Sequence, residues 1–179
     1  MLAFFCNAYI LYLFVLLWYY IYMLKVGDVV FLKNNPERLM TVSAVFGITK
    51  FTGVKKFFEK QFRKIGFCDG DVQCFWFDGK KYNGSFFKAH MLKLKNSNTA
   101  PQMFKVGDRV FLRSDPEMLM TVTLVVGNLS KDIPGFFRER FERKAQKRGY
   151  SDGDVQCQWS IGLRHKIGLI SAAMLEKKV

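Results

Sequence analysis

The chain contains nearly the same stretch of sequence twice, and this duplication constrains its fold more than any other feature. One copy, MLKVGDVVFLKNNPERLMTV, begins at Met23, and the other, MFKVGDRVFLRSDPEMLMTV, begins at Met103. Residues 24–47 align with residues 104–127 without gaps at an offset of 80 (104 − 24). Because self-similarity of this kind is the signature of repeated structural units, the sequence predicts two copies of one small fold.

A second shared block indicates how far the two copies extend. The string GDVQC occurs at Gly70 and again at Gly153, an offset of 83 (153 − 70). A chain of 179 residues that is 50% hydrophobic is long and apolar enough for two small folded units. We therefore predict a first repeat at residues 24–94, a polar linker at 95–103 and a second repeat at 104–179.

Each repeat contains the patterns of several short β-strands. The runs DVVFL and LMTVSAVF are separated by KNNPER, whose Asn, Pro and charged residues suit the turn of a hairpin. Further along, DVQCFWF alternates, and one face of this strand carries the same residue types in both repeats: Val72, Cys74 and Trp76, and Val155, Cys157 and Trp159. The opposite face is aromatic in the first repeat, at Phe75 and Phe77, and polar in the second. We therefore predict that the Val-Cys-Trp face belongs to the core.

The segment between these strands is predicted to form an amphipathic helix. Its apolar residues recur at spacings of three and four in the first repeat: Val54, Phe57, Phe58, Phe62 and Ile65. In the second repeat the segment is longer by four residues, close to one helical turn, and Asp132 and Pro134 are predicted to begin the helix. We expect the first helix to be seated against Phe75 and Phe77.

These elements together predict a mainly β fold with inserted helices, of the α+β class. About five short strands in each repeat favour two tandem small β-barrels of the SH3-like or Tudor-like kind, each carrying one basic amphipathic helix. A split sandwich is the alternative architecture.

The first residues of the chain form a separate apolar segment. Residues 1–24 carry no charge, and as a helix they would extend roughly 36 Å, enough to cross a hydrocarbon core of about 30 Å. We predict an N-terminal hydrophobic transmembrane helix at residues 1–23, with the repeats facing the cytoplasm because the nearest basic residues follow it. The alternative is that translation starts at Met23, which is equivalent to Met103, and that residues 1–22 are not made. The protein would then be soluble and cytoplasmic.

The charge of the chain is strongly positive and concentrated in the two predicted helices. The net charge is +13, and residues 54–64 and 136–148 each contribute +4 (five basic minus one acidic, and six minus two). Such a balance favours a polyanionic partner such as nucleic acid. The candidate polyanion-binding residues are Lys55, Lys56, Lys60, Arg63, Lys64, Arg138, Arg140, Arg143, Lys144, Lys147 and Arg148. The alternatives are a solvated helix face with i to i+4 ion pairs from Glu59, Glu139 and Glu142, and binding to an anionic membrane surface.

The residues that could support catalysis have simpler structural explanations. His90 and His165 do not occupy equivalent positions of the two repeats, and the cysteines have no CxxC spacing. Four aspartates recur next to Gly at strand starts, where turn formation explains them: Asp28, Asp71, Asp108 and Asp154. We therefore predict no catalytic residues, no metal site, no cofactor and no small-molecule substrate, so the protein is not expected to be an enzyme.

The strings VGDVVFLKNNPERLMTV and VQCFWFDGKKYNGSFF resemble the YodC-like family of small bacterial proteins, whose function is unknown. The resemblance covers most of residues 24–177 and implies a small β-barrel of bacterial cytoplasmic origin. The chain departs from that family in its duplication, in its basic helical insertion and in having NNPER and SDPEM where the family usually has a Gly-Gly-Pro turn. The second copy also has Ser160 in place of Phe77, and Leu169-Ile170 in place of Phe86-Phe87. The family-motif residues, for which the resemblance implies structural roles, are Gly27, Asp28, Pro36, Met40, Thr41, Cys74, Trp76, Gly107, Asp108, Pro116, Met120, Thr121, Cys157 and Trp159.

The function predicted from the sequence is non-catalytic binding. The basic helices favour nucleic acid or another polyanion as the ligand. The alternative is a protein-interaction adaptor with a protein partner, and residues 1–22, if translated, add the membrane as a further partner. Trp76 and Trp159 could line a peptide- or base-binding groove, but their alternation with Val and Cys favours the core.

Overall fold

The structure is a computed structural model that describes residues 23–49, 51, 53–79, 81–97 and 102–178. It contains two five-stranded antiparallel sheets and, within the described residues, two α-helices. The first sheet has the order β4-β3-β2-β1-β5. Its strands are β1 (Val29–Leu32), β2 (Asn35–Val45), β3 (Val72–Asp78), β4 (Lys81–Phe87) and β5 (Leu92–Asn96). Helix α2 (Gly53–Lys64) connects β2 to β3, and the 3-10 helix η1 (Ala89–Met91) connects β4 to β5.

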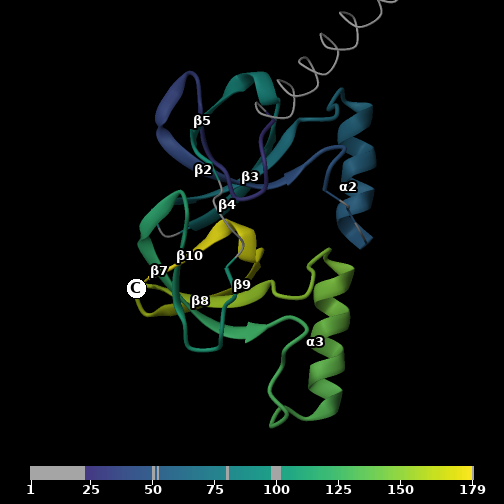
Figure 1. Ribbon diagram of the computed structural model, residues 1–179, viewed down its shortest axis with the longest axis vertical. Helices are drawn as coiled ribbons and strands as arrows, with labels where there is room; N and C mark the ends of the chain where they lie inside the picture. Colours follow the sequence, from purple (N-terminus) through teal and green to yellow (C-terminus); the bar gives the residue numbers. More distant parts are fainter. Residues whose placement is uncertain (1–22, 50, 52, 80, 98–101, 179) are drawn as a thin grey trace, which may run out of the picture.

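The second sheet repeats this plan in the order β10-β6-β7-β8-β9. Its strands are β6 (Arg109–Leu112), β7 (Asp115–Val125), β8 (Val155–Ile161), β9 (Arg164–Ile170) and β10 (Leu175–Lys177). Helix α3 (Gly135–Lys147) lies between β7 and β8, and η2 (Ala172–Met174) lies between β9 and β10. The two sheets are stacked, and both helices lie on the same side of the molecule (Figure 1).

The prediction of SH3-like or Tudor-like barrels is wrong, because neither sheet is closed. Among the described residues, the edge strands β4 and β5 form no ladder with each other, and neither do β9 and β10. Each sheet instead bends within its longest strand, where the register shifts between Val42 and Ala44 of β2 and between Val122 and Leu124 of β7. A bulge increases local twist, so one open sheet curves around its own apolar face without pairing its edges.

Residues 1–22 of the predicted N-terminal helix lie outside the described residues. Within the residues that the structure does describe, no helix is long and apolar enough to cross a membrane.

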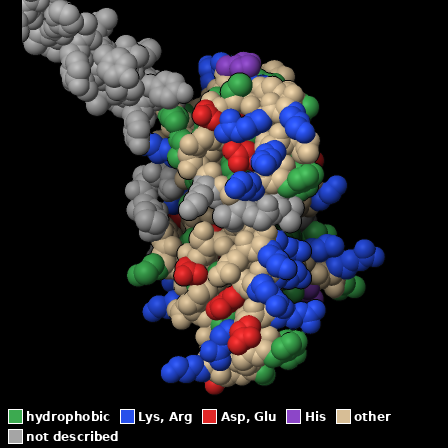
Figure 2. All heavy atoms as spheres, turned by 90° about the vertical axis from the view of Figure 1, so that its right-hand side faces the viewer, with side chains coloured by type: hydrophobic (Ala, Val, Ile, Leu, Met, Phe, Trp, Pro, Cys, Tyr) green, Lys and Arg blue, Asp and Glu red, His purple; other side chains and the backbone are tan. Residues whose placement is uncertain are grey.

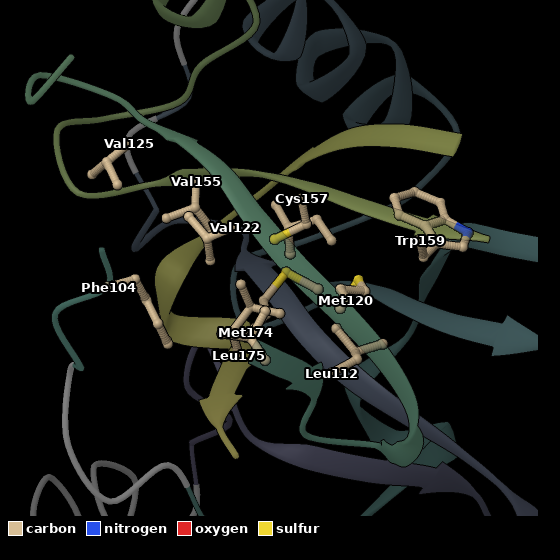
Figure 3. Packing of buried hydrophobic residues seen from close by; sticks show 12 residues of the cluster. Phe104, Leu112, Met120, Val122, Val125, Val155, Cys157, Trp159, Met174 and Leu175 are labelled. Atoms are coloured by element: carbon tan, nitrogen blue, oxygen red, sulfur yellow. The ribbon is translucent and has the colours of Figure 1, made fainter. Parts of the chain in front are cut away.

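The core of each repeat lies on the predicted face of its sheet. In the second repeat the cluster includes Val155, Cys157 and Trp159, with Trp159 only 7% exposed (Figure 3). In the first repeat Val72 and Cys74 are fully buried, but Trp76 is only half-buried and packs at the margin of the cluster. The same alternation therefore buries the tryptophan in one repeat and leaves it partly open in the other.

Two aspartates in each repeat hold the same turns. Asp28 and Asp108 each accept a hydrogen bond from a backbone N–H three residues earlier, at 2.8 Å. Asp71 accepts from the N–H groups of Cys68 and Ala89, at 2.8 and 2.9 Å, so one carboxylate joins the entry of β3 to η1. Asp154 makes the equivalent pair of bonds in the second repeat, both at 2.9 Å. These carboxylates satisfy backbone donors in tight turns, as the sequence predicted.

The expectation that Phe75 and Phe77 seat helix α2 is wrong. Both residues, together with Tyr82, pack against the core cluster of the second repeat. The rings of Phe77 and Tyr82 lie 5.7 and 6.0 Å from Trp159, centroid to centroid. The aromatic face of β3 and β4 therefore forms the interface between the two repeats.

Other phenylalanines seat α2. Phe62 projects from the helix onto Phe86 of β4, with ring centroids 3.8 Å apart, and also contacts Phe67. Ile65, which was predicted to share this apolar face, follows the helix and is 70% exposed. In the second repeat Ala145 is the buried residue of α3, and the predicted cap Asp132 bonds to Ser130 instead of to the helix. Each helix is thus fixed to its sheet by one narrow stripe, and most of its surface remains open.

Candidate nucleic-acid interface

The two basic helices form one side of the molecule. Helices α2 and α3 contact each other, and Figure 1 shows them one above the other beside the stacked sheets. Viewed from that side, Lys and Arg side chains are spread over both halves of the face, with fewer Asp and Glu (Figure 2). We call this side the helix face and define it by α2, α3 and Arg148.

The cations of α2 differ in how free they are. Lys56, Lys60 and Lys64 are exposed, and no described carboxylate forms an ion pair with them. Arg63 is held by Asp69 at 2.7 Å and by Glu59 at 3.1 Å. Hydrogen bonds to these two carboxylates raise the pKa of Arg63 above its ordinary value. The side chain of Lys55 lies outside the described residues.

The cations of α3 are freer. Four of them, and Arg148 just after the helix, are exposed and lack a carboxylate partner among the described residues; the four are Arg140, Arg143, Lys144 and Lys147. Arg138 is half-buried and donates a hydrogen bond to the carbonyl of Ile133 at 3.2 Å. The i to i+4 ion pairs expected for a solvated helix occur only between Glu59 and Arg63 within the described residues.

Each helix also exposes a pair of phenylalanines near its start. Phe57 and Phe58 meet edge to face at 5.9 Å between centroids, and Phe136 and Phe137 do so at 5.7 Å. Phe57 is 59% exposed and Phe136 is 68% exposed. The helix face therefore combines positive charge with apolar aromatic surface in both repeats.

A groove lies between helix and sheet in each repeat, and the two grooves share three equivalent positions. Helix, third strand and fourth strand each supply one residue to both grooves: Phe62 and Phe141, Gln73 and Gln156, and Phe86 and Leu169. The volumes are about 230 Å³ in the first repeat and 270 Å³ in the second. Phe51 and Phe58 complete the first groove, whereas Lys144 and Arg148 help to line the second.

The glutamine in each groove is oriented by a neighbouring hydroxyl group. Ser43 shares its hydroxyl proton between the backbone carbonyl of Gln73, at 3.1 Å, and Oε1 of the same residue, at 3.2 Å. Thr123 makes the same pair of contacts with Gln156. These glutamines were not among the residues predicted from the sequence. Their recurrence in GDVQC, on the strand face opposite the core, is the signal that could have indicated them.

The family-motif residues lie in the framework and away from the helix face. Gly27 and Gly107 take positive φ angles of 92° and 91°, which only glycine adopts without strain. Met40 and Met120 are buried, and Pro36 and Pro116 are exposed near the starts of β2 and β7. Thr41 is buried between the repeats, where it donates to Oγ of Ser114 at 2.9 Å, whereas Thr121 is exposed.

The remaining polar candidates are scattered. His90 is exposed in η1, and His165 lies 3.1 Å from the hydroxyl of Ser160. Cys74 and Cys157 are buried in the two cores; burial raises the pKa of both thiols, that of Cys157 to about 12. Cys68 is exposed. Within the described part of the chain, no group of three His, Cys, Asp or Glu side chains is arranged to hold a metal ion.

Comparisons of the chain with protein-family models, with curated proteins and with solved structures gave no match. The resemblance to the YodC-like family therefore stays a prediction.

Proposed function

We propose that the protein is a non-catalytic binding module that holds nucleic acid, as a polyanion, on the helix face. The observation that carries this proposal is the set of exposed cations on two adjacent helices, of which only Arg63 has a carboxylate partner among the described residues. Cations that are not neutralised within the protein are available to phosphate groups. A YodC-like origin is compatible with this proposal and adds no activity to it.

Phosphate contacts of this kind act through counterion release. A site that makes about six phosphate contacts loses roughly a thousandfold in affinity between 50 and 200 mM salt. The eight exposed cations without a carboxylate partner are numerous enough for such a site: Lys56, Lys60, Lys64, Arg140, Arg143, Lys144, Lys147 and Arg148. Because the helices contact each other, one strand of nucleic acid could engage cations from both repeats at once.

The test is a salt titration of binding. The full chain is mixed with a fluorescently labelled nucleic-acid strand, and the Kd is measured by anisotropy across the salt range. The double variant Lys60→Glu with Arg143→Glu should weaken binding at least about tenfold and flatten the salt dependence. Lys93→Glu with Lys95→Glu reverses two exposed charges on β5, away from the helices, and should have little effect. Binding that is absent, insensitive to salt or equally weakened by both double variants would contradict the proposal.

The exposed phenylalanines favour a second candidate, the protein-interaction adaptor. Phe57 and Phe136 project into solvent at equivalent places, and exposed apolar surface often marks a site of protein contact. In that case the full chain should hold one protein partner after nuclease treatment. Phe57→Ser with Phe136→Ser should then abolish the interaction, and the charge reversals on α2 and α3 should preserve it.

A further inference from the structure

We infer that each groove between helix and sheet accepts one unstacked base of a single-stranded nucleic acid. This inference rests on the proposed function and specifies its ligand. Three equivalent positions line a hollow in both repeats: an apolar helix residue, a glutamine and an apolar strand residue. The inference adds a specific contact with bases to a face that otherwise recognises only charge.

The glutamines supply the polar contact. Because the Oε1 atoms of Gln73 and Gln156 already accept hydrogen bonds from hydroxyl groups, each amide leaves its Nε2 donors for a ligand. The Nε2 atoms have no hydrogen-bond partner among the described residues. A ligand group in the groove is therefore expected to carry an acceptor, as the edge of every nucleic-acid base does.

The walls and the rim of the grooves suit a flat ring attached to phosphates. The first groove is lined by the rings of Phe51, Phe58, Phe62 and Phe86, which offer faces and edges for stacking. In the second groove Lys144 and Arg148 lie beside Phe141, so positive charge adjoins the apolar surface. Both hollows are smaller than the range of about 300 to 1,000 Å³ typical of pockets for drug-sized ligands, which fits a single base.

A duplex cannot place a base in either groove without breaking its base pairs. The bases of a double helix are stacked and paired, so their faces are hidden, whereas a single strand can turn one base outward while its phosphates stay on the cations. The protein is therefore expected to prefer single strands to duplexes of the same length.

The test separates the bases from the phosphates. The full chain is titrated with a labelled single strand, with an abasic strand of equal phosphate number and with the duplex. Stacking of one base on aromatic side chains corresponds to roughly five- to hundredfold in affinity, so we expect at least about tenfold tighter binding of the base-bearing strand than of the abasic strand. The duplex should also bind less tightly than the single strand.

Matched variants assign this preference to the grooves. Gln73→Leu with Gln156→Leu keeps the side-chain size and removes both donors, and it should reduce the preference for the base-bearing strand at least about fivefold. Gln158→Leu makes the same change two residues further along β8, outside the grooves and the helix face, and it should leave the preference unchanged. Circular dichroism of each variant checks that the fold is retained.

The outcomes distinguish the two proposals. Equal, salt-sensitive binding of the base-bearing and abasic strands would overturn the groove inference and leave the proposed function standing. Tighter binding of the duplex would do the same. Absence of binding to any strand would overturn both. An apolar fluorescent probe that occupies the grooves and is not displaced by the single strand would assign them to an apolar partner and overturn the inference.

Discussion

The two repeats share their framework but differ on one face of the sheet. This face lies opposite each repeat's own core, on β3 and β4 in the first repeat and on β8 and β9 in the second. Both keep the aspartate-linked turns, the inserted helix and the groove glutamine. The first repeat carries an aromatic set on this face, and the second carries polar residues at the equivalent positions: Phe75, Phe77 and Tyr82, and Gln158, Ser160 and His165. The aromatic set packs against the second repeat, whereas the polar set borders an open hollow of about 570 Å³.

This difference shows that the interface between the repeats is asymmetric, because the two repeats contribute different surfaces to it. The face of the first repeat receives the β6–β7 hairpin and the tryptophan of the second, but the second repeat has no aromatic face to receive another unit. A head-to-tail contact that used the same face on every unit would continue into an open chain of repeats. The polar residues of the second repeat remove the apolar surface that such a chain would need.

The largest effect is expected at the two tryptophans. Trp159→Ala removes a buried ring and empties the contact with Phe77 and Tyr82, so it should cost about 4 kcal/mol of unfolding free energy. Trp76→Ala removes the equivalent ring where it is half-buried, and it should cost about 2 kcal/mol or less. Urea denaturation of the full chain measures both. Equal costs would contradict the assignment of Phe77 and Tyr82 as the cover of Trp159.

A smaller effect is expected where the aromatic face meets a glycine. Phe75 pairs with Gly84 across β3 and β4, and a Cβ on Gly84 would overlap the Phe75 ring. Gly84→Ala should therefore displace the ring and cost about 2 kcal/mol. The second repeat pairs Gln158 with Ile167, which is largely exposed, so Ile167→Ala should change stability by less than about 0.5 kcal/mol. If both variants unfold at the same urea concentration as the wild type, Phe75 is not confined by the interface.

The hydroxyl between the repeats gives a third comparison. Thr41 donates to Oγ of Ser114 and accepts a hydrogen bond from its backbone N–H at 3.0 Å, in buried surroundings. Thr41→Val leaves these groups of Ser114 buried without a partner and should cost about 1.5 kcal/mol. Thr121 occupies the equivalent position and is exposed, so Thr121→Val serves as the control with a change near zero. Urea denaturation midpoints, compared at a constant m-value, measure the loss of stability in each variant. Equal losses at the two positions would mean that the buried hydroxyl of Thr41 contributes nothing to the interface.

Local patterns predicted much of this structure, and the contacts between repeats account for the main failure. The duplicated blocks, the Val-Cys alternation and the aspartate turns depend on short stretches of chain, and the structure shows them where the sequence placed them. The role of Phe77 depends on a partner more than eighty residues away, which no local period reveals. Whether a sheet closes is likewise decided by the pairing of its edges, which strand patterns do not specify.

Part of the candidate site was likewise predicted from the sequence, and part was found only in the structure. The spacing of apolar residues predicted the first helix, and the concentration of charge selected the cations of α2 and α3 as candidates. The groove glutamines were missed because an isolated Gln on a strand resembles any solvated residue until its neighbours are known. Only the structure brings the hydroxyl of Ser43 against Oε1 of Gln73 and places this glutamine in one groove with the rings of Phe62 and Phe86.

The smallest effect on stability is expected for the ion pair between Asp71 and Lys88, which has no equivalent at Asp154 in the second repeat. Burial alone would raise the pKa of Asp71. The hydrogen bonds from the N–H groups of Cys68 and Ala89 and the ammonium of Lys88, 3.1 Å away, together lower it by more, so the pKa of Asp71 lies below its ordinary value. The native state therefore binds fewer protons than the unfolded state. The stabilisation from Asp71 is present above its unfolded pKa of about 3.9 and is lost as the pH falls through the lower folded pKa.

The second repeat has Ser171 at the position of Lys88, so Lys88→Ser makes the first repeat match it. This change should cost about 0.5 kcal/mol at pH 6, and the cost should shrink between pH 6 and pH 2, because protonation of Asp71 removes the charge that Lys88 pairs with. Urea titrations at the two pH values, followed by tryptophan fluorescence, measure the difference. A cost that persists unchanged at pH 2 would mean that the lysine acts through its hydrogen bond to the carbonyl of Gly66 and its packing on the ring of Phe67, 4.8 Å from its Nζ, and not through the carboxylate.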